Sequence, residues 1–427
     1  MEQIADAHAT VSESVRAFYE RMPYPPPVAD LDAQRALCGD PMRRRALFHQ
    51  AWPAQTQRED YEILVAGCGT SQAVRYAFRE PGARITAIDI SEASLLHTRH
   101  LANRYRLDNL ELHHLPVERV QHLRRSFDLI VCTGVLHHVP DPDLGLQSLR
   151  EVLDRQGAMR LMVYAPYGRA GIYMMQTYCR MLGIGTSDKD LRDLGAGLDA
   201  LPSDHPIATV LRKAKDFRRP DAMADALLHP SDRAFTVGEV YDWLERCGMS
   251  FGRWTEQAPY LPACGRVATG AHAARLAPLA PRLQHGAMEL LRGTMVSHSF
   301  IAYRDDRIGP VSPVTFHGGA WRDYIPIPVA STVCVRNGLP KGCASVLING
   351  AHRYPDLVLP LDPIEDRLHS LMDGTKTLAD VVSSAELDIN GQRLATGFFE
   401  RLWQYDHVIV DASRAGREGS LGKEVGR

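Results

Sequence analysis

The spacing of hydrophobic residues changes along the chain, and from residue 60 to about residue 164 it alternates between two patterns. Short apolar runs, typical of strands buried on both faces of a sheet, are separated by amphipathic stretches with the period of a helix. This alternation favours an α/β domain with a doubly wound, mostly parallel sheet. Five strands are predicted in chain order, at residues 62–66, 84–89, 110–114, 127–132 and 158–164.

A long insertion is expected after the fifth strand, at about residues 166–235, rich first in Met, Tyr and Gly and then in Pro. A helix should follow it, because Thr236 and Glu239 have the spacing of a capping box. Before the fifth strand, Gly157 is typical of the turn that ends a helix. Two further strands, with a helical segment between them, are expected near residues 247–254 and 296–304.

A second, smaller domain is predicted at residues 331–411, after a Pro- and Gly-rich linker at residues 309–330. Its helix signals are strong: Asp362 is a predicted N-cap followed by Pro363 and Glu365, and Gly374 is expected to end the helix. With apolar strands near 344–348, 357–359 and 408–410, the segment resembles a small α+β winged helix of the PqqD type. Residues 412–427 are predicted to be a disordered tail.

The ends of the first two strands carry the most specific motif. The first strand runs into Gly67-Cys-Gly-Thr-Ser71, and the second ends at Asp89. The glycines let the backbone turn sharply against a ligand, and the acid is placed to accept hydrogen bonds from two ribose hydroxyls. A nucleotide-type cofactor is therefore indicated. NAD is disfavoured, because Gln72 stands where the dinucleotide fingerprint needs a third glycine.

With the later stretch Ser126-Phe-Asp-Leu-Ile-Val-Cys-Thr-Gly-Val-Leu-His-His-Val-Pro-Asp-Pro142, these motifs resemble class I S-adenosylmethionine (SAM)-dependent methyltransferases. The resemblance implies a Rossmann-like fold, SAM as cofactor and S-adenosylhomocysteine as product. Three departures from the family pattern are Val65 in place of the acid that commonly precedes the glycine turn, Ser71 as the third small residue, and a missing Gly-Asp pair in residues 112–118. The resemblance implies that the residues binding SAM are Gly67, Cys68, Gly69, Thr70, Asp89, Ile90, Val117, Glu118, Cys132, Thr133 and Gly134.

Candidate catalytic residues lie where the strands end. His137 and His138 follow the fourth strand and could accept the proton of the methyl acceptor, or one of them could brace the loop. Tyr164 and Tyr167, at the end of the fifth strand, could flank a substrate or stabilise the cationic methyl group with their ring faces. Ordinary packing under the insertion is the alternative for both tyrosines.

The insertion offers a further polar pair. Asp225 and His229 are one helical turn apart, which would make a carboxylate and an imidazole neighbours, with Asp232 close by in sequence. The pair is either a structural hydrogen bond or an acid/base couple. We expect no metal in the reaction, because the sulfonium of SAM carries its own activation.

Residues 1–59 are predicted to form an arm in front of the sheet. Helical spacing runs from Val11 to Arg21 behind a capping box of Thr10 and Glu13, and it stops at the prolines of Met22-Pro-Tyr-Pro-Pro-Pro27. The arm is either a surface brace or a lid, in which Tyr19 or Tyr24 reaches over the cofactor and substrate.

Charge and composition narrow the range of partners. The 427 residues carry a net charge of -2, and residues 331–411 hold seven basic against eleven acidic residues, so nucleic acid is disfavoured as a partner. Eight scattered cysteines without a Cys-x-x-Cys pair predict neither a zinc site nor disulfides, as in a reduced cytoplasmic protein. No segment has the roughly 18 to 20 apolar residues of a membrane span.

Together these features predict a cytoplasmic SAM-dependent methyltransferase that acts on an N, O or S atom of a small metabolite or amino-acid-derived compound. One alternative is a peptide or protein methyltransferase that recruits its substrate through the C-terminal domain. A second alternative is a SAM-sensing regulator without catalysis. The sequence leaves a homodimer open.

Overall fold

The computed structural model describes residues 2–307, 314–339 and 341–415, and the chain divides into two compact units. Unit 1 comprises Met1–Leu37, Glu59–Phe251 and Arg292–Arg307. Unit 2 comprises Cys38–Arg58, Gly252–Leu291 and Ile308–Arg427. Each unit therefore contains three separate stretches of the chain.

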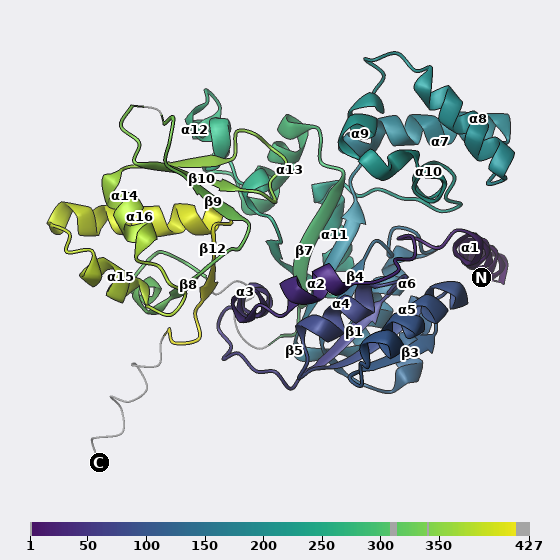
Figure 1. The fold of residues 1–427 in the computed structure, drawn as a ribbon, viewed down its shortest axis with the longest axis horizontal. Helices are drawn as coiled ribbons and strands as arrows, with labels where there is room; N and C mark the ends of the chain where they lie inside the picture. Colours follow the sequence, from purple (N-terminus) through teal and green to yellow (C-terminus); the bar gives the residue numbers. More distant parts are fainter. Residues whose placement is uncertain (1, 308–313, 340, 416–427) are drawn as a thin grey trace. The chain divides into compact units, whose positions relative to one another are not determined.

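Unit 1 contains the large sheet and most of the helices (Figure 1). Its helices are α1 (Glu2–Arg21), α2 (Asp32–Cys38), α4 (Gln72–Arg79), α5 (Glu92–Tyr105), α6 (Pro142–Val152), α7 (Ala170–Leu182), α8 (Asp188–Asp199), α9 (Ala208–Lys213), α10 (Pro220–Leu227) and α11 (Val237–Arg246). Its strands are β1 (Glu62–Ala66), β2 (Arg84–Asp89), β3 (Leu110–His114), β4 (Phe127–Thr133), β5 (Leu153–Tyr164), the first half of β6 (Met249–Trp254) and β7 (Ser297–Arg304). The second half of β6, from Gly252, belongs to unit 2.

The seven strands form one sheet in the order β3-β2-β1-β4-β5-β7-β6. β1 to β5 are parallel to their neighbours, and β7 runs antiparallel to β5. The mostly parallel, doubly wound fold is thus confirmed. The chain direction across the sheet reverses between β1 and β4, and ligands of such sheets bind at the carboxyl ends of the strands at this reversal.

The predicted strands agree with the observed ones, because near-continuous apolar runs identify strands buried on both faces. Gly157 is the exception. It lies inside β5 and not in a helix C-cap, since α6 already ends at Val152 and the chain enters the strand at once. The pairing register of β5 with β4 shifts between Phe127 and Leu129, so β5 accommodates the extra residues as an irregularity of the strand.

The helix ends show where local signals hold and where they fail. Thr236 and Glu239 form the predicted capping box at the start of α11. Thr10 is not an N-cap, because α1 begins at Glu2 and continues through it. Instead the Thr10 carbonyl accepts a hydrogen bond from Ser14 Oγ, and Glu13 pairs with Arg16 on the helix surface. A capping-box spacing inside a longer helical pattern is therefore ambiguous.

The insertion folds into the helices α7, α8, α9 and α10, which form a group of their own in Figure 1. Their apolar faces share one core, which includes Met175, Leu194 and Ile207. Phe18 of α1 belongs to the same core. The N-terminal helix and the insertion are thus packed together, although about 150 residues separate them in the sequence.

Unit 2 is built around two small antiparallel sheets, with strand orders β11-β10-β9 and β12-β8. Its strands are β8 (Ile325–Pro328), β9 (Thr332–Val335), β10 (Ser345–Asn349), β11 (Val358–Leu361) and β12 (Val408–Asp411). Its helices are α3 (Pro41–Ala51), α12 (Ala273–Leu276), α13 (Pro281–Arg292), α14 (Pro363–Ser370), α15 (Leu378–Ser384) and α16 (Ile389–Gln404).

The C-terminal strands and helices lie where the sequence predicts them, including the capping box of Asp362 and Glu365. α14 ends at Ser370, four residues before the predicted stop at Gly374. The predicted linker contains β8, which pairs with β12 inside unit 2. Its first residues and most of the predicted disordered tail lie outside the described residues. The small domain at residues 331–411 as an independent module stays a prediction.

Unit 2 also takes in segments that precede it in the sequence. Arg45 of α3 forms an ion pair of 2.7 Å with Asp411 of β12, and the Ala412 N–H donates to the Pro53 carbonyl. Ala258 and Cys264 belong to the same hydrophobic core as the C-terminal helices. Residues 38–58 are therefore part of unit 2. The pattern of hydrophobic residues could not predict this, because the contact partners are too distant in the sequence.

A buried carboxylate joins the segments of unit 2. Asp406 accepts hydrogen bonds from the backbone N–H groups of Gln257 and Ala258 and pairs with Arg253 at 3.1 Å. Both charged side chains are at least nine-tenths buried. Asp406 itself has a left-handed φ of 55°, which Asp and Asn tolerate better than most residues.

Two expectations on composition can be compared with this fold. All eight cysteines lie among the described residues and are free thiols. Within those residues, no helix combines the length and the apolar character that crossing a bilayer requires.

We predict that Asp406→Asn lowers the free energy of unfolding of unit 2 by about 3 to 5 kcal/mol, because the buried Arg253 cation loses its counter-charge. Urea unfolding followed by tryptophan fluorescence measures this, since four of the five tryptophans belong to unit 2: Trp52, Trp254, Trp321 and Trp403. Arg367→Ala, which breaks the exposed ion pair with Glu386, should cost less than about 1 kcal/mol. Equal effects of the two variants would contradict the role assigned to Asp406.

Candidate active site

The glycine turn at the end of β1 has the backbone conformation that a close ligand contact needs. Gly67 and Gly69 have φ values of 69° and 55°, in the left-handed region that favours glycine. A side chain at Gly67 would overlap with the Val135 side chain in the loop after β4. The turn is therefore fixed both by conformation and by space.

Asp89, the last residue of β2, holds this turn in place. One carboxylate oxygen accepts a hydrogen bond from the Gly69 N–H at 2.8 Å, and the other accepts one from the Ser91 N–H at 2.9 Å. Burial raises the pKa of Asp89, and these backbone donors partly offset that shift. A carboxylate offers about four acceptor positions, so Asp89 retains acceptor capacity for a further donor.

The end of β4 lies beside the glycine turn, because β1 and β4 are neighbours in the sheet. Gln72, the first residue of α4, donates from its side-chain amide to Thr133 Oγ1 at 2.7 Å. Gly134 has a φ of 82°, and its N–H donates to the Met162 carbonyl. Gln72 thus has a positioning role in the place where a dinucleotide site would need glycine.

The remaining predicted cofactor residues surround the same strand ends. Thr70 and Cys68 are buried, and burial raises the pKa of the Cys68 thiol. Burial likewise raises the pKa of the Cys132 thiol at the end of β4. The Ile90 carbonyl is hydrogen-bonded to His114 Nε2, and Glu118 accepts from Ser148 Oγ through its carbonyl, next to the buried Val117.

The N-terminal arm lies directly on the glycine turn. Thr70 Oγ1 donates to the Pro25 carbonyl at 2.8 Å, and a side chain at Gly69 would stand 3.2 Å from Pro25 Cδ. The Glu20 carboxylate accepts hydrogen bonds from the first N–H groups of α5, just after Asp89. A carboxylate at a helix N-terminus is favourable there, so this contact anchors the end of α1.

A cluster of buried imidazole and phenol rings lies at the ends of β4 and β5. The His137 ring stacks on Tyr164 with a centroid distance of 3.8 Å, and His138 stacks on His229 at the same distance. His138 Nδ1 is bonded to the Ser231 carbonyl at 2.7 Å. In contrast, among the residues that the structure describes, neither ring nitrogen of His137 has a hydrogen-bond partner, nor does Nε2 of His229.

Burial keeps these imidazoles neutral. It lowers the pKa of His138 to about 4 and that of His229 to about 2, and it lowers the pKa of His137 well below its usual range. A neutral imidazole has one nitrogen that donates and one that accepts. The cluster therefore offers uncharged proton acceptors in a place without bulk water.

An ion pair that the sequence did not indicate borders the cluster. Arg169 pairs with Asp232 at 3.0 Å, and its guanidinium carbon lies 3.4 Å from the centre of the Tyr164 ring. Gln176 of α7 donates to the same Asp232 oxygen at 2.8 Å. The other oxygen, Asp232 Oδ1, has no partner. Arg169 and Gln176 could not be found from sequence, because Asp232 is 63 and 56 residues away from them.

Asp225 is bound to the arm and not to His229. The Tyr19 hydroxyl donates to Asp225 Oδ1 at 3.2 Å. α10 ends at Leu227, so His229 lies beyond the helix, and the predicted carboxylate–histidine pair on one helical face is wrong. Burial raises the pKa of Asp225 to about 7, although the hydrogen bond from Tyr19 acts in the opposite direction.

The predicted substrate tyrosines differ in their surroundings. Tyr19 has its ring 5.4 Å from that of His229, which places it at the border of the cluster. Tyr24 and Tyr167 are more exposed, at 37% and 41%. Tyr19 is therefore the tyrosine of the three that the fold brings to the buried rings.

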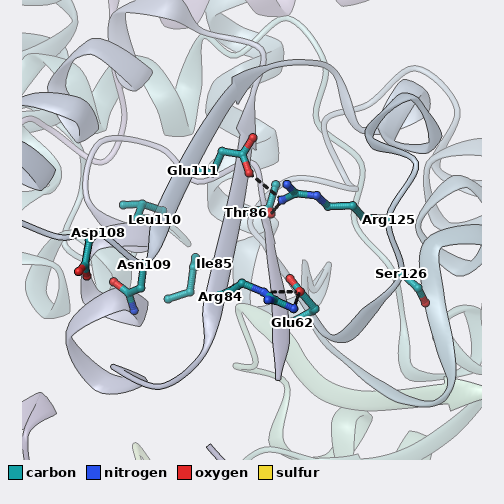
Figure 2. Close-up of a pocket in the computed structure, with 10 residues that line it drawn as sticks. All are labelled: Glu62, Arg84, Ile85, Thr86, Asp108, Asn109, Leu110, Glu111, Arg125 and Ser126. Atoms are coloured by element: carbon teal, nitrogen blue, oxygen red, sulfur yellow. Dashed lines mark hydrogen bonds and ion pairs between the residues drawn. The ribbon is translucent and has the colours of Figure 1, made fainter. Parts of the chain in front are cut away.

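A separate hollow lies at the opposite edge of the sheet. It has a volume of about 470 Å³ and is lined by residues at the amino ends of the strands, such as Glu62, Arg84 and Leu110. Figure 2 shows Arg84 directed at Glu62 and Arg125 directed at Glu111. The two arginines are thus paired with glutamates inside the hollow, and the hollow lies at the edge of the sheet opposite to the glycine turn.

Residues 64–159 match a family described as a methyltransferase domain. An uncharacterized protein of Synechococcus sp. is 32% identical over 268 residues, which cover 59% of this chain and 62% of that protein. A ubiquinone biosynthesis O-methyltransferase of Acinetobacter baumannii is 33% identical over 82 residues, 19% of this chain and 34% of that enzyme. The human thiol S-methyltransferase TMT1B is 29% identical over 140 residues, 32% of this chain and 57% of that enzyme.

Among solved structures, PKMT2 from Rickettsia typhi in complex with AdoHcy has the same fold, with a TM-score of 0.60 and 15% identity. The match covers 87% of this chain and 75% of that one. The chain spans less than two thirds of the length of each relative matched by sequence. Residues 64–159, which lie within unit 1, therefore match a methyltransferase domain, in agreement with the motifs in the sequence.

Proposed function

We propose that the chain is a SAM-dependent methyltransferase that transfers a methyl group to an N, O or S atom of a small acceptor. The observation that carries the proposal is the set of buried polar atoms without a partner beside Tyr164: both ring nitrogens of His137, Nε2 of His229 and Asp232 Oδ1. Buried polar groups are nearly always hydrogen-bonded, so a group left without a partner calls for a ligand. These atoms suit a substrate that presents N–H, O–H or S–H donors.

The cofactor residues fit SAM. Gly67 leaves no room for a side chain, and Asp89 keeps acceptor capacity for a ribose hydroxyl. Gly67, Gly69, Thr133 and Gly134 would hold the methionine part, and Asp89 the ribose. When bound, SAM supplies a methyl group that is already activated by the positive sulfur.

The chain then has to orient the acceptor and take up its proton. His137 is the proposed proton acceptor, because it is neutral and neither of its nitrogens is otherwise engaged. His138 is bonded to the Ser231 carbonyl, which supports a bracing role for this second histidine. Asp225, with a pKa of about 7, can pass a proton onward near neutral pH through Tyr19.

Burial favours a small acceptor over a protein. The rings of His137, His138 and His229 lie in side chains no more than 6% exposed, beneath the insertion and the arm. A compound enclosed by these elements would be separated from water, which strengthens electrostatic interactions in the site. The matched relatives are named for a hydroxyl and for a thiol acceptor, which supports this range of nucleophiles.

The contacts of the N-terminal arm support its interpretation as a lid. It combines a contact on the cofactor turn, through Pro25, with a contact on the proton-accepting region, through Tyr19 and Asp225. A brace would need only the first of these. A peptide substrate recruited by unit 2 and a SAM sensor without catalysis remain the alternatives that the experiments below distinguish.

The first experiment is on SAM binding. Asp89→Ala should weaken the affinity for SAM by a factor of about 10 to 10⁴, because one or two hydrogen bonds to a charged acceptor are lost at about 1.5 to 3 kcal/mol each. Calorimetric titration measures the affinity, and SAM should also protect the proline run of the arm from proteolysis. Asp108→Ala, at the opposite edge of the sheet, is the matched control and should bind SAM as the unaltered chain does. An unchanged affinity in Asp89→Ala would refute the assignment of the site.

The second experiment is on turnover. His137→Ala should reduce the release of S-adenosylhomocysteine by a factor of about 10² to 10⁴ without changing SAM affinity, since it removes the proton acceptor. The release is measured with panels of small amines, phenols and thiols. His100→Ala on the exposed side of α5 is the control. If the methyl group of labelled SAM were transferred only to polypeptides, the peptide alternative would be favoured. If SAM were bound but S-adenosylhomocysteine were released with none of the acceptors, the SAM sensor would be favoured.

The third experiment tests the raised pKa of Asp225. The folded protein binds this proton up to about pH 7, whereas the unfolded chain releases it near pH 3.9, so the stability of the protein falls as pH rises between these values. Asp225→Asn lacks the titration. The free energy of unfolding of the variant minus that of the unaltered chain should therefore increase with pH. The increase should be up to about 1.4 kcal/mol per pH unit from pH 4 to 7, and the difference should then level off. Denaturation at stepped pH measures this, with Asp221→Asn on the same helix as control; a flat difference would refute the shift.

A further inference from the structure

Three side chains with metal-binding chemistry, none of them part of the candidate active site, converge in unit 2. Cys334 lies on the strand β9, and Asp366 and His369 lie one turn apart on α14. One ligand atom from each lies within 4.8 Å of the other two. Across residues 2–307, 314–339 and 341–415, no other group of three such ligands comes together.

The spacing of the three atoms is close to that of a metal site. Zinc binds sulfur at about 2.3 Å and nitrogen or oxygen at about 2.0 to 2.2 Å, so ligands of a tetrahedral ion lie about 3.3 to 3.8 Å apart. The three atoms need to approach one another by about 1 Å. All three residues are half-buried, so side-chain rotation can provide this movement without a shift of the backbone.

The two elements that carry the ligands are firmly placed. α14 starts at a complete capping box, with Pro363 in its first turn, and this fixes the helical positions of Asp366 and His369. β9 is paired with β10, in a register that sets Cys334 opposite Leu347. The buried Ser345 Oγ donates to Asp366 Oδ1 at 2.6 Å. Such a hydrogen bond orients a carboxylate, as the outer-shell partners of metal ligands do.

The pair Cys334 and Asp366 already attracts a cation. The Arg336 guanidinium donates to Cys334 Sγ at 3.1 Å and to Asp366 Oδ1 at 2.7 Å. The Arg336 side chain is half exposed, so it can turn into solvent when another cation takes its place. A thiolate and a carboxylate together carry two negative charges, which balance a divalent ion.

We propose that Cys334, Asp366 and His369 form a zinc site that keeps one coordination position open to water. A sulfur, a nitrogen and an oxygen ligand together suit Zn²⁺, whereas Mg²⁺ and Ca²⁺ take oxygen ligands. The site escapes the usual cysteine-spacing motifs because its ligands come from a strand and a helix 32 residues further along the chain. The ion would join β9 to α14 inside unit 2.

The test is zinc binding by the untagged, full-length protein after treatment with a chelator and dialysis. Titration against a chromogenic zinc chelator should give one ion per chain, and zinc should raise the thermal midpoint of unfolding. Cys334→Ser and His369→Gln should each lower the affinity at least about 10-fold. With Co²⁺ as the probe, a thiolate charge-transfer absorption should appear and should be lost in Cys334→Ser.

Two further variants make the result specific. Cys343→Ser removes another half-buried thiol close by in the sequence and should leave zinc binding unchanged. Arg336→Gln removes the competing cation and should raise the affinity for zinc. Less than one ion per chain in the unaltered protein, or zinc binding that persists unchanged in Cys334→Ser, would overturn the proposal. Because far-UV circular dichroism reports whether each variant is folded, a loss of binding in a folded variant can be assigned to the lost ligand.

Discussion

The hydrogen bond from the Gly69 N–H to the Asp89 carboxylate is the contact on which the candidate site depends. It joins the ends of β1 and β2 and holds a turn whose two glycines have left-handed φ values. The Gly69 carbonyl is held as well, by Thr98 Oγ1 at 2.9 Å. Gln72, Thr133 and the proline run of the arm all take their places against this turn. The cofactor region is therefore rigid and preorganised, and it needs little rearrangement to bind a ligand.

The cluster of buried rings beside the cofactor region depends on the exclusion of water and not on shape alone. The sheet supplies His137, His138 and Tyr164, the insertion supplies Asp225 and His229, and the arm supplies Tyr19. Each element removes solvent from the side chains of the others. Burial has opposite effects on acids and bases: it keeps the imidazoles neutral and raises the pKa of the carboxyl toward 7. Uncharged bases and a carboxyl that titrates near neutrality thus arise from the same physical cause.

Local patterns in the sequence were sufficient for the sheet and the cofactor turn. Apolar runs identify buried strands, and Gly67, Gly69 and Asp89 lie next to one another in the motif and in the fold. Features that depend on distant partners were not accessible. The pair of Arg169 and Asp232 joins residues near the two ends of the insertion, and the helix boundary at Leu227 separates Asp225 from His229. A helical spacing predicts neighbours only if the helix continues between them.

During translation α3 is synthesised long before β12, the strand against which α3 packs. Arg45 and Asp411 are 366 residues apart in the chain. At a synthesis rate of about 5 to 20 residues per second, α3 waits roughly 20 to 70 s for β12. During that interval α3 lacks β8 and β12, the strands that it contacts in the finished fold. The stabilisation that α3 gains from the ion pair of Arg45 with Asp411 therefore becomes available only after β12 has been synthesised, so unit 2 cannot complete its fold earlier.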